Sequence, residues 1–140
     1  MYLQSAVEAV FNALKSSEAL DGCVIIKAFP FVKKPARLRH TVITVSPAQA
    51  KLKNTELGGE NAVGIFCVSI DIFTPQEQGC PAQNGVTDSI IKAVYPLCPT
   101  ELYVSDFKGS DELGAFEAKC TASFSDVYTP YEEQGGQSGE

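Results

Sequence analysis

One long alternating segment, Ala62 to Phe73, most constrains what this chain can fold into. Its even-numbered residues are apolar and its odd-numbered residues are mixed, as in the sequence AVGIFCVSIDIF. Because successive residues of a strand point to opposite faces, this pattern predicts a strand with one buried face and one half-exposed face. We expect the strand to end at Thr74-Pro75.

Apolar residues are spaced as in an amphipathic helix once before this strand and once after it. Apolar residues recur every three to four positions over Tyr2–Ser17, which predicts an amphipathic helix that ends before Asp21-Gly22. A second helix is predicted over Val86–Tyr95, capped by Asn84 or Thr87 and ended by Pro96. The segment Pro75–Gly85, rich in Gly and Pro, is expected to be a loop.

The remaining extended segments lie on both sides of the central strand. Further strands are predicted over residues 23–29, 38–45, 101–107 and 115–128, with Pro47 stopping the second of them. Residues 48–61 are polar and are expected to form a loop. The closing pair of strands, joined by the turn Lys108–Gly114, is expected to form a hairpin.

The predicted order of elements is α-β-β-β-α-β-β. Strands and helices do not alternate, so we expect an α+β fold: a mixed, mainly antiparallel sheet with both helices packed on one face. Residues 1–128 are expected to form a single domain, and residues 129–140, with Gly135, Gly136 and Gly139, a flexible tail. The expected core is Val10, Leu14, Phe66, Val68, Ile70, Ile72, Ile90, Val94, Phe116, Ala118 and Cys120.

The five cysteines are widely spaced and none lies in a C-x-x-C pair, which argues against a zinc or thioredoxin-like motif. Cys67 and Cys120 fall in predicted strands and are expected to be small buried residues. Cys80 is expected to be the most exposed. A Cys80–Cys98 disulfide stays open as an alternative, although a cytosolic site of synthesis argues against it.

Charge is divided unevenly along the chain. The segment Gly22–Thr55 contains no Asp or Glu and seven of the eleven basic residues, whereas the rest carries all seventeen acidic ones. The segment is either a solvated basic loop or an interaction surface for nucleic acid or for an acidic face of a neighbouring copy. The candidate surface residues are Lys33, Lys34, Arg37, Arg39, Lys51 and Lys53. Non-specific DNA contact stays open as an alternative, but aromatic residues do not alternate with the basic residues, as stacking on nucleobases would require.

The residue types that carry chemistry are scarce. His40 is the single histidine, and a Cys–His nucleophilic pair would need it close to Cys67 or Cys120. The adjacent carboxylates Asp111-Glu112 and Glu132-Glu133 fall in a turn and in the tail, and no phosphate-loop or metalloprotease motif is present. We therefore expect no catalytic residues, no cofactor and no metal, and an enzyme using Cys and His40 is the least favoured alternative.

The order of elements and three of its segments resemble a known family. These are the strand Gly64–Pro75, the helix Val86–Tyr95 that follows a loop with Gly79, and the closing hairpin from Phe107 to Tyr128. Together they resemble the tail-terminator, or tail-completion, proteins of tailed bacteriophages and prophages. The resemblance covers about Tyr2 to Tyr128 and rests on the pattern of elements.

The resemblance implies a structural role in the virion tail, with assembly in the cytoplasm of the bacterial host. Such proteins form a ring, often a hexamer, at the head-proximal end of the tail tube, where they stop tube polymerisation and present the head-joining surface. The implied partners are other copies of the chain, a tail tube protein and a head–tail connector protein, with no membrane involved. Another oligomeric neck, connector or tail adaptor subunit is the alternative.

Overall fold

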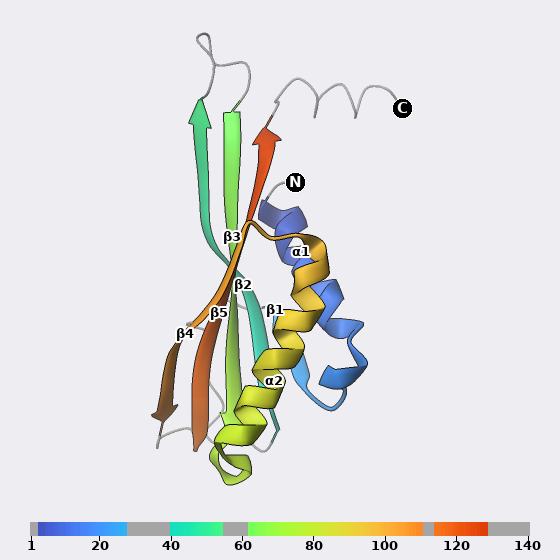
Figure 1. The fold of residues 1–140 in the computed structure, drawn as a ribbon, viewed down its shortest axis with the longest axis vertical. Coiled ribbons are helices and arrows are strands. Elements are labelled where there is room, and N and C mark those ends of the chain that lie inside the picture. Colours follow the sequence, from blue (N-terminus) through green and yellow to red (C-terminus); the bar gives the residue numbers. More distant parts are fainter. Residues whose placement is uncertain (1–2, 28–39, 55–61, 111–113, 129–140) are drawn as a thin grey trace.

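The fold is a five-stranded sheet with two helices against one of its faces. A computed structural model describes residues 3–27, 40–54, 62–110 and 114–128. In chain order the elements are helix α1 (Leu3–Lys15), strands β1 (Val24–Lys27), β2 (Val42–Asn54) and β3 (Ala62–Pro75), helix α2 (Gly79–Val94), and strands β4 (Glu101–Ser110) and β5 (Ala115–Tyr128). Short 3-10 turns stand at Glu18–Leu20, Gln76–Gln78 and Tyr95–Leu97. The α+β class and the predicted order are confirmed (Figure 1).

The sheet is mixed and mainly antiparallel, as predicted. Its strand order is β1-β2-β3-β5-β4, in which only the β1–β2 pair is parallel. The two longest strands, β3 and β5, pair from Ala62–Tyr128 to Pro75–Ala115. β3 therefore lies at the centre, which agrees with its long alternating sequence.

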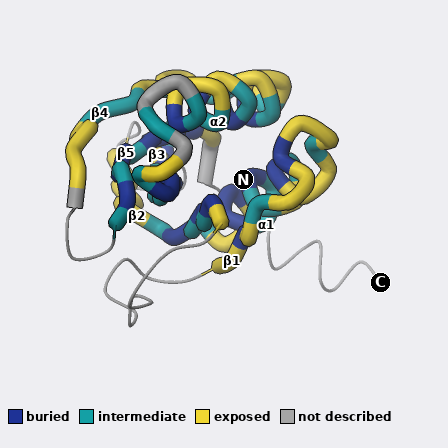
Figure 2. The backbone as a smooth tube through the Cα atoms, turned by 90° about the horizontal axis from the view of Figure 1, so that it is seen from below, coloured by how far each residue is buried: buried dark blue, intermediate teal, exposed yellow. Residues whose placement is uncertain are grey.

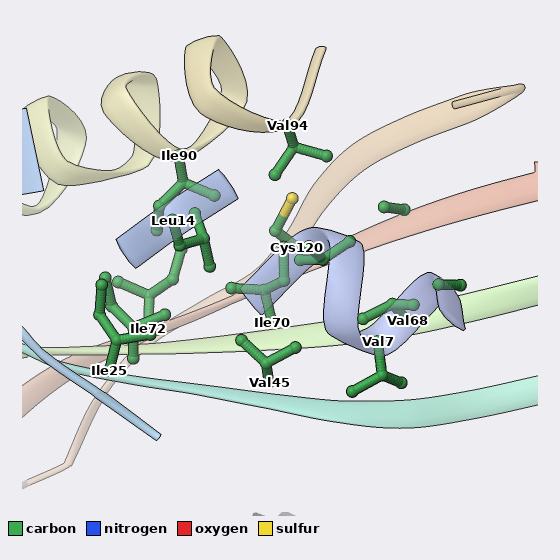
Figure 3. Packing of buried hydrophobic residues seen from close by; sticks show 14 of the residues in the cluster. Val7, Leu14, Ile25, Val45, Val68, Ile70, Ile72, Ile90, Val94 and Cys120 are labelled. Atoms are coloured by element: carbon green, nitrogen blue, oxygen red, sulfur yellow. The ribbon is translucent and has the colours of Figure 1, made fainter. Parts of the chain in front are cut away.

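The core lies between the sheet and the two helices (Figure 3). Val10 and Leu14 of α1 and Ile90 and Val94 of α2 are fully buried, against Ile70 of β3 and its neighbours. The sequence-predicted core is confirmed, except that Phe116 is only partly buried. Phe116 lies near the end of the sheet, opposite Thr74, where β5 begins.

Strand β2 is longer than predicted because Pro47 does not stop it. The register against β3 shifts between Pro47 and Gln49, so Ala48 is an extra residue, and the strand continues to Asn54. A bulge is one of the places where a sheet tolerates proline, since its missing N–H need not join the ladder. The predicted loop over residues 48–61 was wrong for 48–54, and residues 55–61 lie outside the described chain.

Helix α2 begins earlier than predicted. It starts at Gly79, whose φ of 78° lies in a region that favours glycine, so Pro75–Gly85 is not a loop. Pro81 falls in the first turn of this helix, where a backbone N–H has no helical partner to lose. The capping prediction was also wrong: the Thr87 hydroxyl donates to the carbonyl of Gln83 at 2.9 Å within the helix.

Candidate interaction surface

Among the described residues, no helix covers the face of the sheet opposite α1 and α2 (Figure 2), and we refer to this face as the open face. It carries the odd-numbered residues of β3 and their cross-strand partners. Hydroxyl groups form a row across four strands, in which Ser46 lies opposite Ser69, Ser69 opposite Thr121, and Thr121 opposite Tyr103. The first three are buried, and Tyr103 on the edge strand is 48% exposed. Of this row, Tyr103 is therefore the side chain presented to a partner, because the Ser46 and Ser69 hydroxyl oxygens are shielded from solvent.

A hollow of about 340 Å³ indents the open face between β2 and β4. Its lining mixes hydroxyls with charged groups of both signs: Glu101 and Asp106 of β4, and Lys119 of β5. The Cys67 sulfur and the Ser123 hydroxyl, both in the lining, lie 3.3 Å apart. The hollow is shallow and polar, unlike the deep apolar pockets that hold small molecules.

Strand β4 is one free edge of the sheet. Among the described strands it pairs with β5 alone, and a bulge between Ser105 and Lys108 interrupts that pairing, with Asp106 at a φ of 58°. Phe107 in the bulge is 57% exposed. The regular stretch available on this edge is therefore Glu101–Ser105.

The other free edge is the second half of β2, which we call the arm strand (Ala48–Asn54). All seven of its residues are exposed, because β1 pairs only with Val42–Val45 and the ends of β2, β3 and β5 project past both helices (Figure 1). Leu52 is 53% exposed. Within the described residues, no strand pairs with the arm strand on the side away from β3.

The structure places only two of the six candidate basic residues. Lys51 and Lys53 stand on the open face of the arm strand, opposite Ile65 and Val63 of β3, and not in a loop. Lys33, Lys34, Arg37 and Arg39 lie outside the described residues. The structure therefore supports a basic arm strand.

Lys27, another basic residue of the segment Gly22–Thr55, is held by contacts with helix α1. Its Nζ donates to Glu8 Oε1 at 2.6 Å and lies 4.9 Å from the centre of the Phe11 ring. The hydrogen bond from Lys27 holds the pKa of the exposed Glu8 carboxyl below its ordinary value. These contacts join β1 to α1 and leave Lys27 less free than Lys51 and Lys53 to bind a partner.

The structure does not bring Cys67 to His40. His40 precedes β2 at the end where Val42 pairs with Phe73, whereas Cys67 lies six residues further along β3, about 20 Å away at strand spacing. Cys67 is only partly buried, on the open face, and not in the core as expected. Cys120 is fully buried, and this burial raises the pKa of its thiol to about 11, so the thiol stays protonated.

The structure also describes Cys98, the grouping of residue types that can bind a metal ion, and the length of the helices. Cys98 is an exposed free thiol, while the side chain of Cys80 lies outside the description. In the described part of the chain, no group of three or more His, Cys, Asp or Glu residues could hold a metal ion. Over the same residues, no helix is long and apolar enough to cross a membrane.

The two free edges are not recognisable as edges from the sequence alone. Lys51-Leu52-Lys53 and Glu101-Leu102-Tyr103-Val104 both alternate polar or aromatic residues with apolar ones, which is the pattern of a strand. The first lies in the polar segment 48–61, which the sequence predicts to be a loop after a strand that stops at Pro47. No protein-family model matches this chain, and no curated protein matches it.

Proposed function

We propose that this protein is a structural subunit of a bacteriophage or prophage tail, which forms a ring at the head-proximal end of the tail tube. There it stops tube polymerisation and presents the surface that joins the head. The observation that carries the proposal is the arm strand Ala48–Asn54, exposed over its whole length. A long exposed edge in a lone monomer invites uncontrolled pairing, so such edges are normally covered or used.

The shape of the subunit supports assembly into a ring. A ring needs two different surfaces that meet on successive copies, because an interface between identical patches closes a dimer instead. The sheet has two unlike edges, a basic one on β2 with Lys51 and Lys53, and one on β4 with Glu101 and Asp106. The open face remains available in such an assembly for the tube or connector protein.

The decisive experiment measures assembly alone and with a tube protein. Light scattering and electron microscopy of the purified chain should give a closed ring. Adding it to a polymerising tail tube protein should yield tubes of limited length capped at one end, while the tube protein alone grows without limit. A chain that stays monomeric at high concentration and leaves tube growth unchanged would overturn the proposal.

A further inference from the structure

We propose that the arm strand of one copy pairs with β4 of the next, so that the ring is joined by backbone hydrogen bonds between two specific edges. This inference rests on the proposed function, because it names the contact that would close the ring. The occupant of each edge is a second copy of this chain. Adding a strand to an exposed edge is a common way for proteins to associate.

Strand direction fits this pairing. β2 and β4 run in opposite directions, since β2–β3, β3–β5 and β5–β4 are each antiparallel. Copies related by a rotation keep their direction along the ring axis, so β4 of one copy meets β2 of the next antiparallel to it. This is the more stable kind of ladder.

Side chains fit on both faces in one register, with Lys53 opposite Glu101 of the next copy. On the open face this register also sets Lys51 opposite Tyr103, which is 48% exposed. The aromatic side chain of Tyr103 can there make a cation–π contact with the ammonium group of Lys51. On the helix side it sets Leu52, which is 53% exposed, opposite the partly buried Leu102. Lys51, Lys53 and Glu101 are exposed, and within the described residues none of them has an ion pair.

Ring closure fits the same register. Counted along the strand direction within one copy, the arm strand lies about four residues beyond the level of the regular part of β4. Pairing these two edges therefore staggers neighbouring copies by about 13 Å along the strands. Four strand spacings separate one interface from the next, about 19 Å. The resulting strand tilt of about 35° is the value at which sheets close into barrels. The stagger therefore suits a ring and not a flat row.

The test is a charge reversal with rescue. K51E/K53E should keep the melting curve of the wild type but need at least about tenfold more protein for half-assembly at low salt, because the Lys53–Glu101 attraction becomes a repulsion and the Lys51–Tyr103 cation–π contact is lost. Adding Glu101→Lys to this variant should recover part of the lost assembly, because it restores an opposite-charge pair between positions 53 and 101 but not the contact with Tyr103. K15E/K92E, which changes net charge equally on the exposed helix surfaces, is the matched control and should assemble normally.

Cysteine cross-linking tests directly the register between the arm strand of one copy and β4 of the next. Lys53→Cys/Glu101→Cys should give a ladder of disulfide-linked copies on oxidation, while Lys15→Cys/Glu101→Cys should not. Rings that form normally in K51E/K53E and give no ladder would overturn the edge pairing and leave the proposed function standing. A wild-type chain that forms no ring would overturn the proposed function itself.

Discussion

The ring of Phe66 occupies the place where a side chain on Gly64 would stand. A Cβ built on Gly64 would lie 2.6 Å from Cζ and 2.8 Å from Cε2 of Phe66, and 3.2 Å from Cδ2 of Leu52. Phe66 is only 5% exposed, so its ring cannot swing aside into solvent. The glycine and the aromatic ring thus form one packing unit at the base of the arm strand.

Gly64→Ala should therefore destabilise the protein by about 1–3 kcal/mol, the usual cost of overpacking a closed site. Gly85→Ala is the matched control, because Gly85 lies inside α2 with nothing within 4 Å of the added Cβ. It should stabilise the protein by about 0.4–1 kcal/mol, since alanine restricts the unfolded chain. Chemical denaturation measures both. Equal effects of the same sign would contradict the close contact at Gly64.

Two isoleucines of β3 should respond very differently to truncation. Ile70 is fully buried at the centre of the sheet, so Ile70→Ala should cost about 2–5 kcal/mol, and Ile70→Asp should abolish folding by burying an unpaired charge. Ile65 is 39% exposed on the open face of the same strand, and Ile65→Ala should cost well under half as much. Denaturation midpoints compare the two. A soluble Ile70→Asp chain with an unchanged melting curve would refute the register of β3.

The Glu8–Lys27 contact gives a prediction about pH. The pKa of Glu8 is lowered in the fold by the hydrogen bond from Lys27, so this contact stabilises the fold above the ordinary carboxyl pKa. Its contribution is lost as the pH falls through the lowered pKa. A pH titration by NMR should show the pKa of Glu8 rising in Lys27→Met. Lys15→Met, which removes a nearby cation that lies over Phe11, should leave it unchanged.

Thiol reactivity should follow burial. Cys98 is exposed and should react first with a thiol reagent, while Cys120 should react only on unfolding, because it is buried with a thiol pKa of about 11. Burial also raises the pKa of Cys23, which should slow its reaction. Mass spectrometry after timed labelling gives the order. Selective early labelling of Cys67 that disappears in His40→Ala would instead favour a Cys–His enzyme.

Strong alternation made most of the sheet predictable from sequence. The limits of β5 were predicted without error, and β3 extends only two residues beyond its predicted end, because each strand has a long run of alternating apolar residues. The two clear errors in the bounds of the elements both concern proline. Pro47 sits in a β-bulge and Pro81 in the first turn of α2, and in each case the cost of a missing N–H depends on neighbours that local sequence does not identify.

The candidate surface was less predictable than the fold. Charge counting selected Lys51 and Lys53 correctly as exposed residues, but it could not locate Glu101 and Tyr103 as the complementary edge. An edge is defined by which strand is left without a neighbour, and that follows from the strand order β1-β2-β3-β5-β4. Nothing in the periodicity of a single strand distinguishes an edge from the interior of a sheet.

The pairing of β3 with β5 has a consequence for synthesis on the ribosome. Ala62 and Tyr128 are partners, so this pairing cannot be complete until nearly the whole described chain has been translated. Until β5 emerges, one side of β3 lacks its neighbour while Phe66, Val68, Ile70 and Ile72 have already left the ribosome. Such a nascent chain exposes an apolar strand edge for seconds at ordinary rates of elongation. We expect slow translation of β4 and β5 to increase its aggregation and its dependence on chaperones.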